Sequence, residues 1–423
     1  MSDAPRILHV GARHPELSEG DAPRAAHDLF LASRAAGLDA VFLAACGPKD
    51  VPALLKPGAV ITGFDARPHE HLFLADGVED TWHRNLSHRA LTWFAAFLQE
   101  MRPEVVHVHD VTTIGLDALL VARRALPAAR LVMTLHDFSP ICRADGLMVR
   151  RSDGTLCERA SALRCHQCFP GTAPEMFRLR EDWVQHALSV VDAFVAPTDF
   201  VRRRYLAWGL PAEKLHVVPD VPPACAAAQD RVAIRETRPA EPANRFGVFG
   251  TPLDAASLAL LIDALELYEA GDSPPITVEV TGAGLCDAAP DLRARFNAAG
   301  SAMRNRVRLR DAGACADAEL PARMARVHWV VLPSVRWEAF GRLASFAFQA
   351  GRPLVCGNIG GLAERVRHDG DGLLFEAGDP ASLAATLRRC ATEPGLHARL
   401  AAAAPAEPDA LDVVRVNRAV YRV

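Results

Sequence analysis

Residues 330–375 alternate short apolar runs with helical segments, and this pattern narrows the possible folds more than any other part of the chain. Val330–Pro333 predicts a strand, a helix begins near Gly341, and Pro353–Cys356 predicts the next strand. Such alternation is typical of parallel β-α-β units. In these units ligands bind beyond the carboxyl ends of the strands. The stretch therefore predicts a Rossmann-like domain with a ligand site after Pro333.

The loops of this stretch carry residues that suit a sugar phosphate. A carboxylate lies in the loop after the first strand, and two residues later Phe-Gly opens the helix. A glycine pair and a second carboxylate follow the next strand. Helix N–H groups and the helix dipole attract phosphate, and a carboxylate accepts hydrogen bonds from hydroxyls. The residues concerned are Glu338, Phe340, Gly341, Gly360, Gly361 and Glu364.

This spacing resembles the C-terminal half of the retaining GT-B glycosyltransferases of family four. In that family a Glu precedes Phe-Gly, a second Glu follows eight residues after the first, and Gly-Gly-x-x-Glu lies downstream. The resemblance implies that Glu338 contacts the hydroxyls of the donor sugar. The second Glu, which usually holds the nucleotide ribose, is replaced by Phe346. The layout therefore matches the family, and one donor contact departs from it.

Length and composition favour two soluble domains. The chain has 423 residues, 50% of them hydrophobic and 23% charged, with a net charge of −4. This charge gives no basic field for nucleic acid. No signal peptide or 18-residue apolar stretch is present, so we expect a cytoplasmic protein with reduced or metal-bound cysteines. Peripheral contact with the inner membrane remains open, because the acceptor could be lipid-linked.

The N-terminal half repeats the strand–helix alternation and places polar pairs at strand exits. The predicted strands are Arg6–Val10, Ala40–Leu43, Val105–Val108, Leu131–Leu135, Ala193–Ala196 and Leu215–Val218. Residues 44–84 are expected to be irregular, with weak hairpin signals. His109-Asp110 follows one strand and His136-Asp137 the next. The family resemblance implies that His136 contacts the donor sugar or phosphate. His107, inside a strand, is expected to make a structural hydrogen bond.

The first loop of the N-terminal half departs from the family. Family members usually have Gly-Gly there, which lets backbone N–H groups approach a phosphate or the acceptor, whereas this chain has Gly20-Asp21. A carboxylate beside such a nest repels an anion. A phosphate is therefore not expected there. The residues expected on the acceptor side of the predicted site are Gly20, Asp21, His109, Asp110 and Asp137.

Four cysteines fall within 27 residues: Cys142, Cys157, Cys165 and Cys168. The last two have C-x-x-C spacing, and four thiolates suit tetrahedral zinc. A metal would also stabilise a polar loop that is otherwise poorly ordered. Free thiols, one disulfide or an iron–sulfur cluster are the alternatives. Zinc at this loop would be structural, and no catalytic metal is expected.

The basic residue that pairs with the donor diphosphate in the family is missing from this sequence. In the family an Arg or Gln, and then a Lys, follow the first strand of the C-terminal half. Here that strand, Phe246–Phe249, ends at Gly250, and no basic residue occurs before Arg293. We expect the diphosphate to bind helix N–H groups, or Arg336 and Arg342 beside Glu338, since guanidinium binds phosphate in a bidentate manner.

The resemblance implies a GT-B architecture, with two doubly wound α/β domains facing a cleft. The predicted parts are an acceptor domain at 1–221 with the cysteine loop 142–168, a linker at 222–244, a donor domain at 245–405, and a helix at 406–423 that crosses back to the N-domain. The linker is inferred from a segment rich in Pro and Ala without periodicity.

The implied function is retaining transfer of a sugar from a nucleotide-sugar donor to a glycan, a lipid-linked acceptor or a protein. The alternative is a catalytically inactive GT-B relative that serves as a binding or partner subunit, because the diphosphate cation and the ribose Glu are both missing. A dinucleotide-dependent enzyme is disfavoured, since Gly282/Gly284 lacks the third glycine and the spaced acidic partner.

Overall fold

The structure is a computed structural model that describes residues 5–18, 20–47, 60–64, 67–75, 77–79, 81–223, 242–250, 255–281 and 290–423. The chain divides into two units. The first contains residues 1–221 and 408–423, and the second contains residues 222–407. Most of the predicted linker, the four residues after Gly250, and Gly282 and Gly284 lie outside the described residues.

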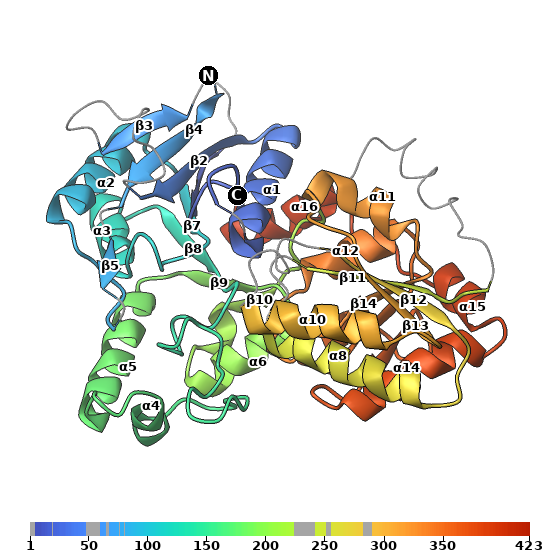
Figure 1. The fold of residues 1–423 in the computed structure, drawn as a ribbon. Coiled ribbons are helices and arrows are strands. Elements are labelled where there is room, and N and C mark those ends of the chain that lie inside the picture. The colour runs from blue at the N-terminus through green and yellow to red at the C-terminus, as the bar shows by residue number, and fades with distance from the viewer. Residues whose placement is uncertain are drawn as a thin grey trace. The chain divides into compact units, whose positions relative to one another are not determined.

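The first unit is built on an eight-stranded sheet in the order β10-β9-β8-β7-β1-β2-β4-β3 (Figure 1). Every pairing in it is parallel except that of β3 with β4. The strands of the unit, including the small β5–β6 pair, are β1 Arg6–Gly11, β2 Asp39–Cys46, β3 Ile61–Phe64, β4 Arg67–Leu74, β5 Val78–Glu79, β6 Arg84–Asn85, β7 Val105–Val108, β8 Arg130–Thr134, β9 Ala193–Ala196 and β10 Leu215–Val217.

The expectation that residues 44–84 are irregular is wrong for β3 and β4. Strand β4 pairs in parallel with β2, and β3 folds back on β4 as an antiparallel edge. The sequence of β4, RPHEHLFL, has charged and polar residues in its first half. The strand was missed because Glu70, a polar residue, occupies a core position, where it is buried against His14 and His27.

Helices pack on the first sheet, and the last helix of the chain is one of them. The helices of this unit are α1 Asp21–Ala35, α2 His88–Met101, α3 Asp117–Ala125, α4 Ala162–Cys168, α5 Pro174–Ser189, α6 Asp199–Trp208, α16 Ala410–Tyr421 and the 3-10 helix Ala212–Lys214. Helix α16 contacts α1, and its residues Val413, Val414 and Tyr421 share a core with β1, β7, β8 and β9. The return of the C-terminal helix to the N-terminal unit is thereby confirmed.

The second unit has a six-stranded, fully parallel sheet in the order β13-β12-β11-β14-β15-β16. Counted from its own first strand this is 3-2-1-4-5-6, the dinucleotide-binding order, with its switch point between β11 and β14. Its elements are β11 Arg245–Phe249, β12 Ile276–Thr281, β13 Val307–Asp311, β14 Trp329–Leu332, β15 Leu354–Gly357, β16 Gly372–Phe375, α8 Ala255–Ala270, α10 Pro290–Ala302, α11 Leu320–Met324, α12 Arg342–Gln349, α13 Gly360–Arg365, α14 Pro380–Thr392, α15 Leu396–Ala402 and the 3-10 helix Asp317–Glu319.

Both faces of the second sheet are covered at its centre, which explains why β14 and β15 are continuous apolar runs. Alternate residues of β14 enter different cores. Trp329 and Val331 pack with α8, α10 and α14, whereas Val330 and Leu332 pack with α11, α12 and α13. Residues of β14 thus alternate between the two cores, and the loop follows at the carboxyl end of this fully buried strand.

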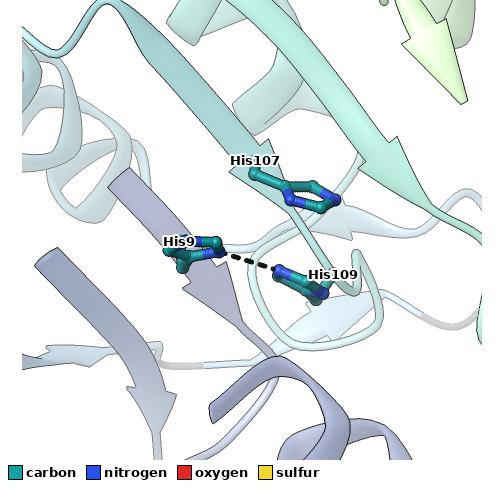
Figure 2. A group of neighbouring side chains, drawn as sticks. All are labelled: His9, His107 and His109. Atoms are coloured by element: carbon teal, nitrogen blue, oxygen red, sulfur yellow. Dashed lines mark hydrogen bonds between the residues drawn. The ribbon is translucent and has the colours of Figure 1, made fainter. Parts of the chain in front are cut away.

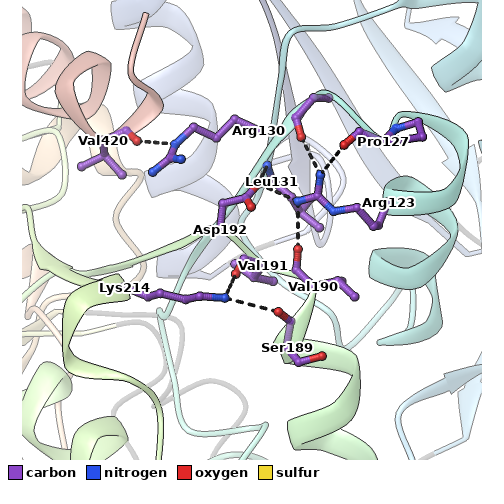
Figure 3. A network of polar contacts seen from close by, with 11 residues as sticks. Arg123, Pro127, Arg130, Leu131, Ser189, Val190, Val191, Asp192, Lys214 and Val420 are labelled. Atoms are coloured by element: carbon purple, nitrogen blue, oxygen red, sulfur yellow. Dashed lines mark hydrogen bonds and ion pairs between the residues drawn. The ribbon is translucent and has the colours of Figure 1, made fainter.

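Cationic side chains near the amino ends of β8 and β9 bind backbone carbonyls (Figure 3). Arg123 donates to the carbonyls of Pro127 and Val190 and pairs with Asp192 at 2.6 Å. Lys214 donates to the carbonyl of Val191 at 2.7 Å. Ligands of doubly wound sheets bind at the opposite, carboxyl edge. This network therefore stabilises the fold at the edge of the sheet away from the candidate site.

Among the residues that the structure describes, no helix is both long and apolar enough to cross a membrane.

Candidate functional site

The loop after β14 is built around the backbone of Glu338. The N–H of Gly361 donates to the Glu338 carbonyl at 2.6 Å, and the Ser334 hydroxyl donates to Oε1 of Glu338 at 2.8 Å. Gly360 has φ +63°, and a Cβ there would meet the Glu338 nitrogen and carbonyl oxygen at 2.7 Å. Only glycine tolerates both conditions. The glycine pair that the sequence singled out therefore holds Glu338 in place through backbone contacts.

Helix α12 begins directly after this loop at Gly341, whose φ is +76°. Arg365, the last residue of α13, contacts the two residues before the first turn of α12. Its guanidinium donates to the Gly341 carbonyl at 3.0 Å and lies 4.0 Å from the ring centre of Phe340. It also binds Glu407 at 2.7 and 2.9 Å, and both side chains are largely buried. Sequence reasoning missed Arg365, because its partners are distant in the chain.

The other predicted donor residues lie in the same unit. Gly250 directly follows β11, the strand beside β14, and Arg336 is half-buried in the loop before Glu338. Glu364 is exposed on α13. The part of these three residues in a common site with Glu338 stays a prediction.

Phe346 and Arg342 lie one turn apart on α12. The Phe346 ring is 2% exposed and belongs to the core beneath the helix, so this position does not present a polar group to a ligand. The Arg342 guanidinium lies 5.6 Å from the Phe346 ring centre, and its Nε is 3.9 Å from Asp317 Oδ2. A cation over an aromatic face is attracted to it. The replacement of the family's Glu thus gives Arg342 a supporting ring.

The first unit brings four histidines to the carboxyl ends of its central strands. His9 lies on β1, His107 and His109 lie on and just after β7, and His136 follows β8. The sheet order reverses direction between β1 and β7, which is the switch point of this unit. Nδ1 of His9 is 3.2 Å from Nε2 of His109, and Nδ1 of His109 is 3.2 Å from Nε2 of His136. Sequence reasoning missed His9 because it lies within a buried strand.

His107 makes the structural hydrogen bonds that were predicted. Its Nδ1 is 2.7 Å from the Tyr421 hydroxyl on α16, and its Nε2 is 2.7 Å from the Thr134 hydroxyl. Burial holds the pKa of His107 well below its ordinary value. A buried, doubly bonded imidazole ties the last helix to the sheet, and the prediction is confirmed.

Acidic residues follow the same strand ends. Asp110 accepts hydrogen bonds from Thr112, and Asp137 accepts one from the Ser139 N–H at 2.8 Å. Burial and the neighbouring charge of Asp137 raise the pKa of Asp110 to about 7, and burial raises the pKa of Asp137. Two carboxyl groups that share a site do not both ionise easily. The pair can therefore hold a proton near neutral pH.

The family models agree with this geometry. Residues 22–220 match the family described as "Glycosyl transferase 4-like domain", and residues 244–393 match "Glycosyl transferases group 1". Solved GT-B structures share the fold over nearly the whole chain. HepE of Anabaena, solved with UDP and glucose, has 18% identity and a TM-score of 0.66, and the alignment covers 99% of this chain and 100% of that one. The chain belongs to the GT-B glycosyltransferases.

Other relatives of this glycosyltransferase are similar only in part or only in fold. Sucrose-phosphate synthase of Thermosynechococcus elongatus has 15% identity and a TM-score of 0.61, over 99% of this chain and 96% of that one. D-inositol 3-phosphate glycosyltransferase of Salinispora arenicola is 40% identical over 83 residues, which are 20% of this chain and 18% of that protein. Glycogen synthase of Mycobacterium tuberculosis is 43% identical over 86 residues, 20% of each. The chain thus matches about a fifth of the length of these curated relatives.

The acceptor-side prediction for Gly20 and Asp21 falls at the start of α1 of the glycosyltransferase. Gly20 is the residue before the helix, with φ +142°, and Asp21 is exposed as its first residue. Near this loop, Glu70 accepts hydrogen bonds from Nε2 of His14 at 2.8 Å and of His27 at 3.0 Å. Burial raises the pKa of Glu70, but these bonds outweigh it and the net direction is down.

The His14–Glu70–His27 group has donor atoms close enough for a metal ion. However, Nδ1 of His14 accepts a hydrogen bond from the Glu16 N–H at 3.2 Å. A neutral imidazole with a lone pair on Nδ1 carries its proton on Nε2, which then donates to Glu70. The group is therefore a buried carboxylate held by hydrogen bonds.

The cysteine loop places four free thiols in one region. Burial raises the pKa of Cys165 to about 11, and the charges of Cys142, Cys157 and Cys168 act in the same direction. Within the described residues, two groups have all their possible ligand atoms within 4.8 Å of one another, and the cysteines are not among them. The thiols are neighbours, but their sulfur atoms do not form a compact set of metal ligands.

Proposed function

We propose that the protein is an active retaining glycosyltransferase that moves a sugar from a nucleotide-sugar donor to a glycan, a lipid-linked acceptor or a protein. The observation that carries this proposal is the Glu338 loop. The Gly361 N–H holds the backbone carbonyl of Glu338, and the Ser334 hydroxyl holds its half-buried carboxylate. The loop lies just before a helix that starts without a side-chain cap. Such a helix start suits phosphate, and the carboxylate suits sugar hydroxyls.

In the proposed reaction the protein orients and stabilises rather than forming a covalent bond. Glu338 orients the donor sugar, and His136 donates a hydrogen bond to the sugar or the diphosphate. The charge of the leaving diphosphate is stabilised by the N–H groups at the start of α12 and by Arg336 or Arg342. The departing phosphate takes the proton of the acceptor hydroxyl, which then bonds to the same face of the sugar.

Thermal stabilisation by UDP, GDP, ADP and TDP tests the donor site. We expect one base to raise the melting temperature of the wild type and this shift to shrink in Glu338→Ala. Glu266→Ala, which removes an exposed carboxylate on α8, is the matched control and keeps the full shift. Turnover of the corresponding nucleotide sugar, with the anomeric configuration read by NMR, tests retention. Absence of a shift with all four at millimolar concentration would sink the proposal.

The second candidate is an inactive partner subunit. It is favoured by the buried Phe346 at the ribose position and by the lack of a basic residue between Gly250 and Arg293. Each lost contact removes about 1–3 kcal/mol of charge-assisted hydrogen bonding. Nucleotide binding without turnover of any nucleotide sugar would favour this candidate over the first.

We also propose that the four cysteines of the loop 142–168 hold a structural zinc ion. Four neighbouring thiols with one C-x-x-C pair support this, although their sulfur atoms are not in a compact arrangement. We expect about one zinc per chain by elemental analysis, lost in Cys165→Ser and kept in the matched control Cys315→Ser. A mass two hydrogens lower indicates a disulfide instead, and visible absorbance with bound iron indicates a cluster.

A lipid-linked acceptor would bring the protein to a membrane surface. Leu86 and Trp93, at and near the start of α2, are 64% and 46% exposed and support peripheral contact. Co-sedimentation with anionic phospholipid vesicles tests this. Binding that Trp93→Ala weakens would support it, and absence of co-sedimentation would contradict it.

A further inference from the structure

Three imidazole rings form a continuous chain at the switch point of the first sheet. His9, His109 and His136 come from three neighbouring strands, and the rings stack with centre distances of 5.5 Å at both steps. Figure 2 shows His9 and His109 joined by their contact, with His107 lying beside them. His9 is 0% exposed and His109 is 3% exposed. The chain therefore runs from the core toward the strand exit where His136 lies.

The ring nitrogens of His9, His107 and His109 are close enough to hold a metal ion, but most of them already have partners within the protein. Nδ1 of His9 and Nε2 of His109 lie 3.2 Å apart, at hydrogen-bond distance from each other. Both nitrogens of His107 are bonded to Tyr421 and Thr134. The rings are therefore joined by hydrogen bonds, and each bond needs one N–H and one lone pair.

Because burial lowers the pKa of His9 to about 3 and also depresses that of His109, both rings are neutral at pH 7. A chain of neutral imidazoles has only two polarities. Either each ring donates from Nδ1, or each ring donates from Nε2. The two ends of the chain decide between them.

At the buried end, Nε2 of His9 has no hydrogen-bond partner among the described residues. If every ring donates from Nδ1, this nitrogen is an unpaired lone pair. In the opposite polarity it is an unpaired N–H in the core. Orphaned buried N–H groups are the rarer and more costly case. The buried end therefore favours donation from Nδ1.

At the other end, Nδ1 of His136 lies 3.7 Å from Oδ1 of Asp220. An N–H on Nδ1 is attracted by this carboxylate, whereas a lone pair there is repelled. Both ends thus favour the same polarity. The 3.7 Å distance is longer than a hydrogen bond, which leaves the direction of this N–H open to a ligand oxygen.

We propose that His9 and His109 are positioning residues that hold His136 as the Nδ1–H tautomer, so that this N–H donates to an oxygen of the donor's sugar or diphosphate. Asp220 attracts the same N–H and so favours the proton on Nδ1. The inference rests on the proposed function only for the ligand, because the tautomer is a property of the free protein. Imidazoles in water favour the proton on Nε2, so the expected tautomer differs from the solution default.

Long-range proton–nitrogen NMR of the full chain, labelled with 15N-histidine, reads the tautomer directly. In the wild type we expect His136 with a protonated Nδ1 and an unprotonated Nε2. His109→Phe removes the donor to Nε2 and should shift His136 toward the Nε2–H form. His109→Gln restores an N–H donor and should retain the wild-type pattern. The matched control Thr134→Val perturbs His107 but not the chain, and should leave His136 unchanged.

An Nε2–H pattern for His136 in the wild type overturns the proposal, as does an unchanged pattern in His109→Phe. Should His109→Phe not fold, the wild-type spectrum together with Asp220→Asn decides, since loss of the carboxylate should also admit the Nε2–H form. Adding UDP or UDP-glucose separates the ligand sources. A change at His136 Nδ1 with UDP indicates the diphosphate, and a change only with UDP-glucose indicates the sugar.

Kinetics then test the positioning role apart from the function itself. With the nucleotide sugar that the wild type turns over, His109→Phe should lower kcat/KM about tenfold, which corresponds to one misplaced hydrogen bond. His109→Gln should recover most of this loss. Normal kcat/KM in His109→Phe contradicts a role in the reaction. If the wild type binds no nucleotide, the proposed function fails while the tautomer result stands.

Discussion

At the β1/β7 switch point the first unit fills the strand ends with imidazole rings, whereas at the β11/β14 switch point the second unit uses glycine. His9, His109 and His136 are placed by bonds between side chains. Glu338 is placed by the Gly361 N–H, and by the absence of a Cβ at Gly360. The comparison teaches that one sheet order supports two kinds of site. The first should respond to protonation, and the second to added side-chain atoms.

The largest effect is expected from Arg365→Ala in the second unit. This change leaves Glu407 buried without its partner and removes the donor to the Gly341 carbonyl. Breaking a buried pair on one side costs about 3–5 kcal/mol. Urea unfolding measures this loss of stability. The control is Arg415→Ala, which removes an exposed ion pair with Asp412 and should cost less than about 0.5 kcal/mol. Equal losses in the two variants would mean that Arg365 does not support the loop.

Gly360→Ala should come next. The new Cβ meets backbone atoms of Glu338 at 2.7 Å, and φ is +63°, so we expect a loss of about 2–3 kcal/mol and weaker nucleotide binding. Gly378→Ala is the matched control, because φ is +82° with nothing within 4 Å, and it should cost only about 1 kcal/mol. Denaturant unfolding of both variants isolates the contact. A difference near zero would show that the loop yields to the extra atom.

The first unit should instead be sensitive to acid. Burial lowers the pKa of His9 from 6.5 to about 3, so the unfolded chain binds a proton between these values that the folded chain does not. The stability that depends on neutral, buried His9 is fully present above pH 6.5. It is lost as the pH falls, at about 1.4 kcal/mol per pH unit, which amounts to about 2 kcal/mol by pH 5. The raised pKa of Asp110 acts oppositely, since stability from its neutral form is lost as pH rises toward 7.

Unfolding free energy as a function of pH, compared between the wild type and His9→Phe, isolates the histidine term. The variant should show a slope shallower by one proton between pH 6.5 and pH 4. Identical slopes would mean that His9 titrates normally in the folded protein.

The smallest effect is expected from Tyr421→Phe. It removes the hydroxyl that lies 2.7 Å from Nδ1 of His107 and should cost about 1 kcal/mol. Tyr268→Phe is the matched control in the second unit, where the hydroxyl donates to the Pro274 carbonyl at 2.8 Å. The melting temperature should fall by a similar amount in both variants. Only Tyr421→Phe should move the 15N resonances of His107, and movement in both would contradict the local role of this bond.

Much of the second unit could be predicted from local pattern. The predicted strands at 246–249 and 353–356 agree with β11 and β15 to within one residue at each end, because a short apolar run between loop and helix signals is a local feature of the sequence. The glycine pair was also predicted, since a positive φ needs glycine wherever it occurs. Strand β4 was missed because its buried Glu70 and its histidines interrupt the apolar pattern.

The sequence by itself determined the two α/β domains, the glycine turn beside Glu338 and the histidines at the strand exits, because these follow from the local alternation of residues. Only the tertiary structure decided which of them meet. His9 and His109 are 100 residues apart in the chain, and Arg365 and Glu407 are 42 apart. Strand order and register bring such pairs within hydrogen-bond distance, and neither can be read from a single strand.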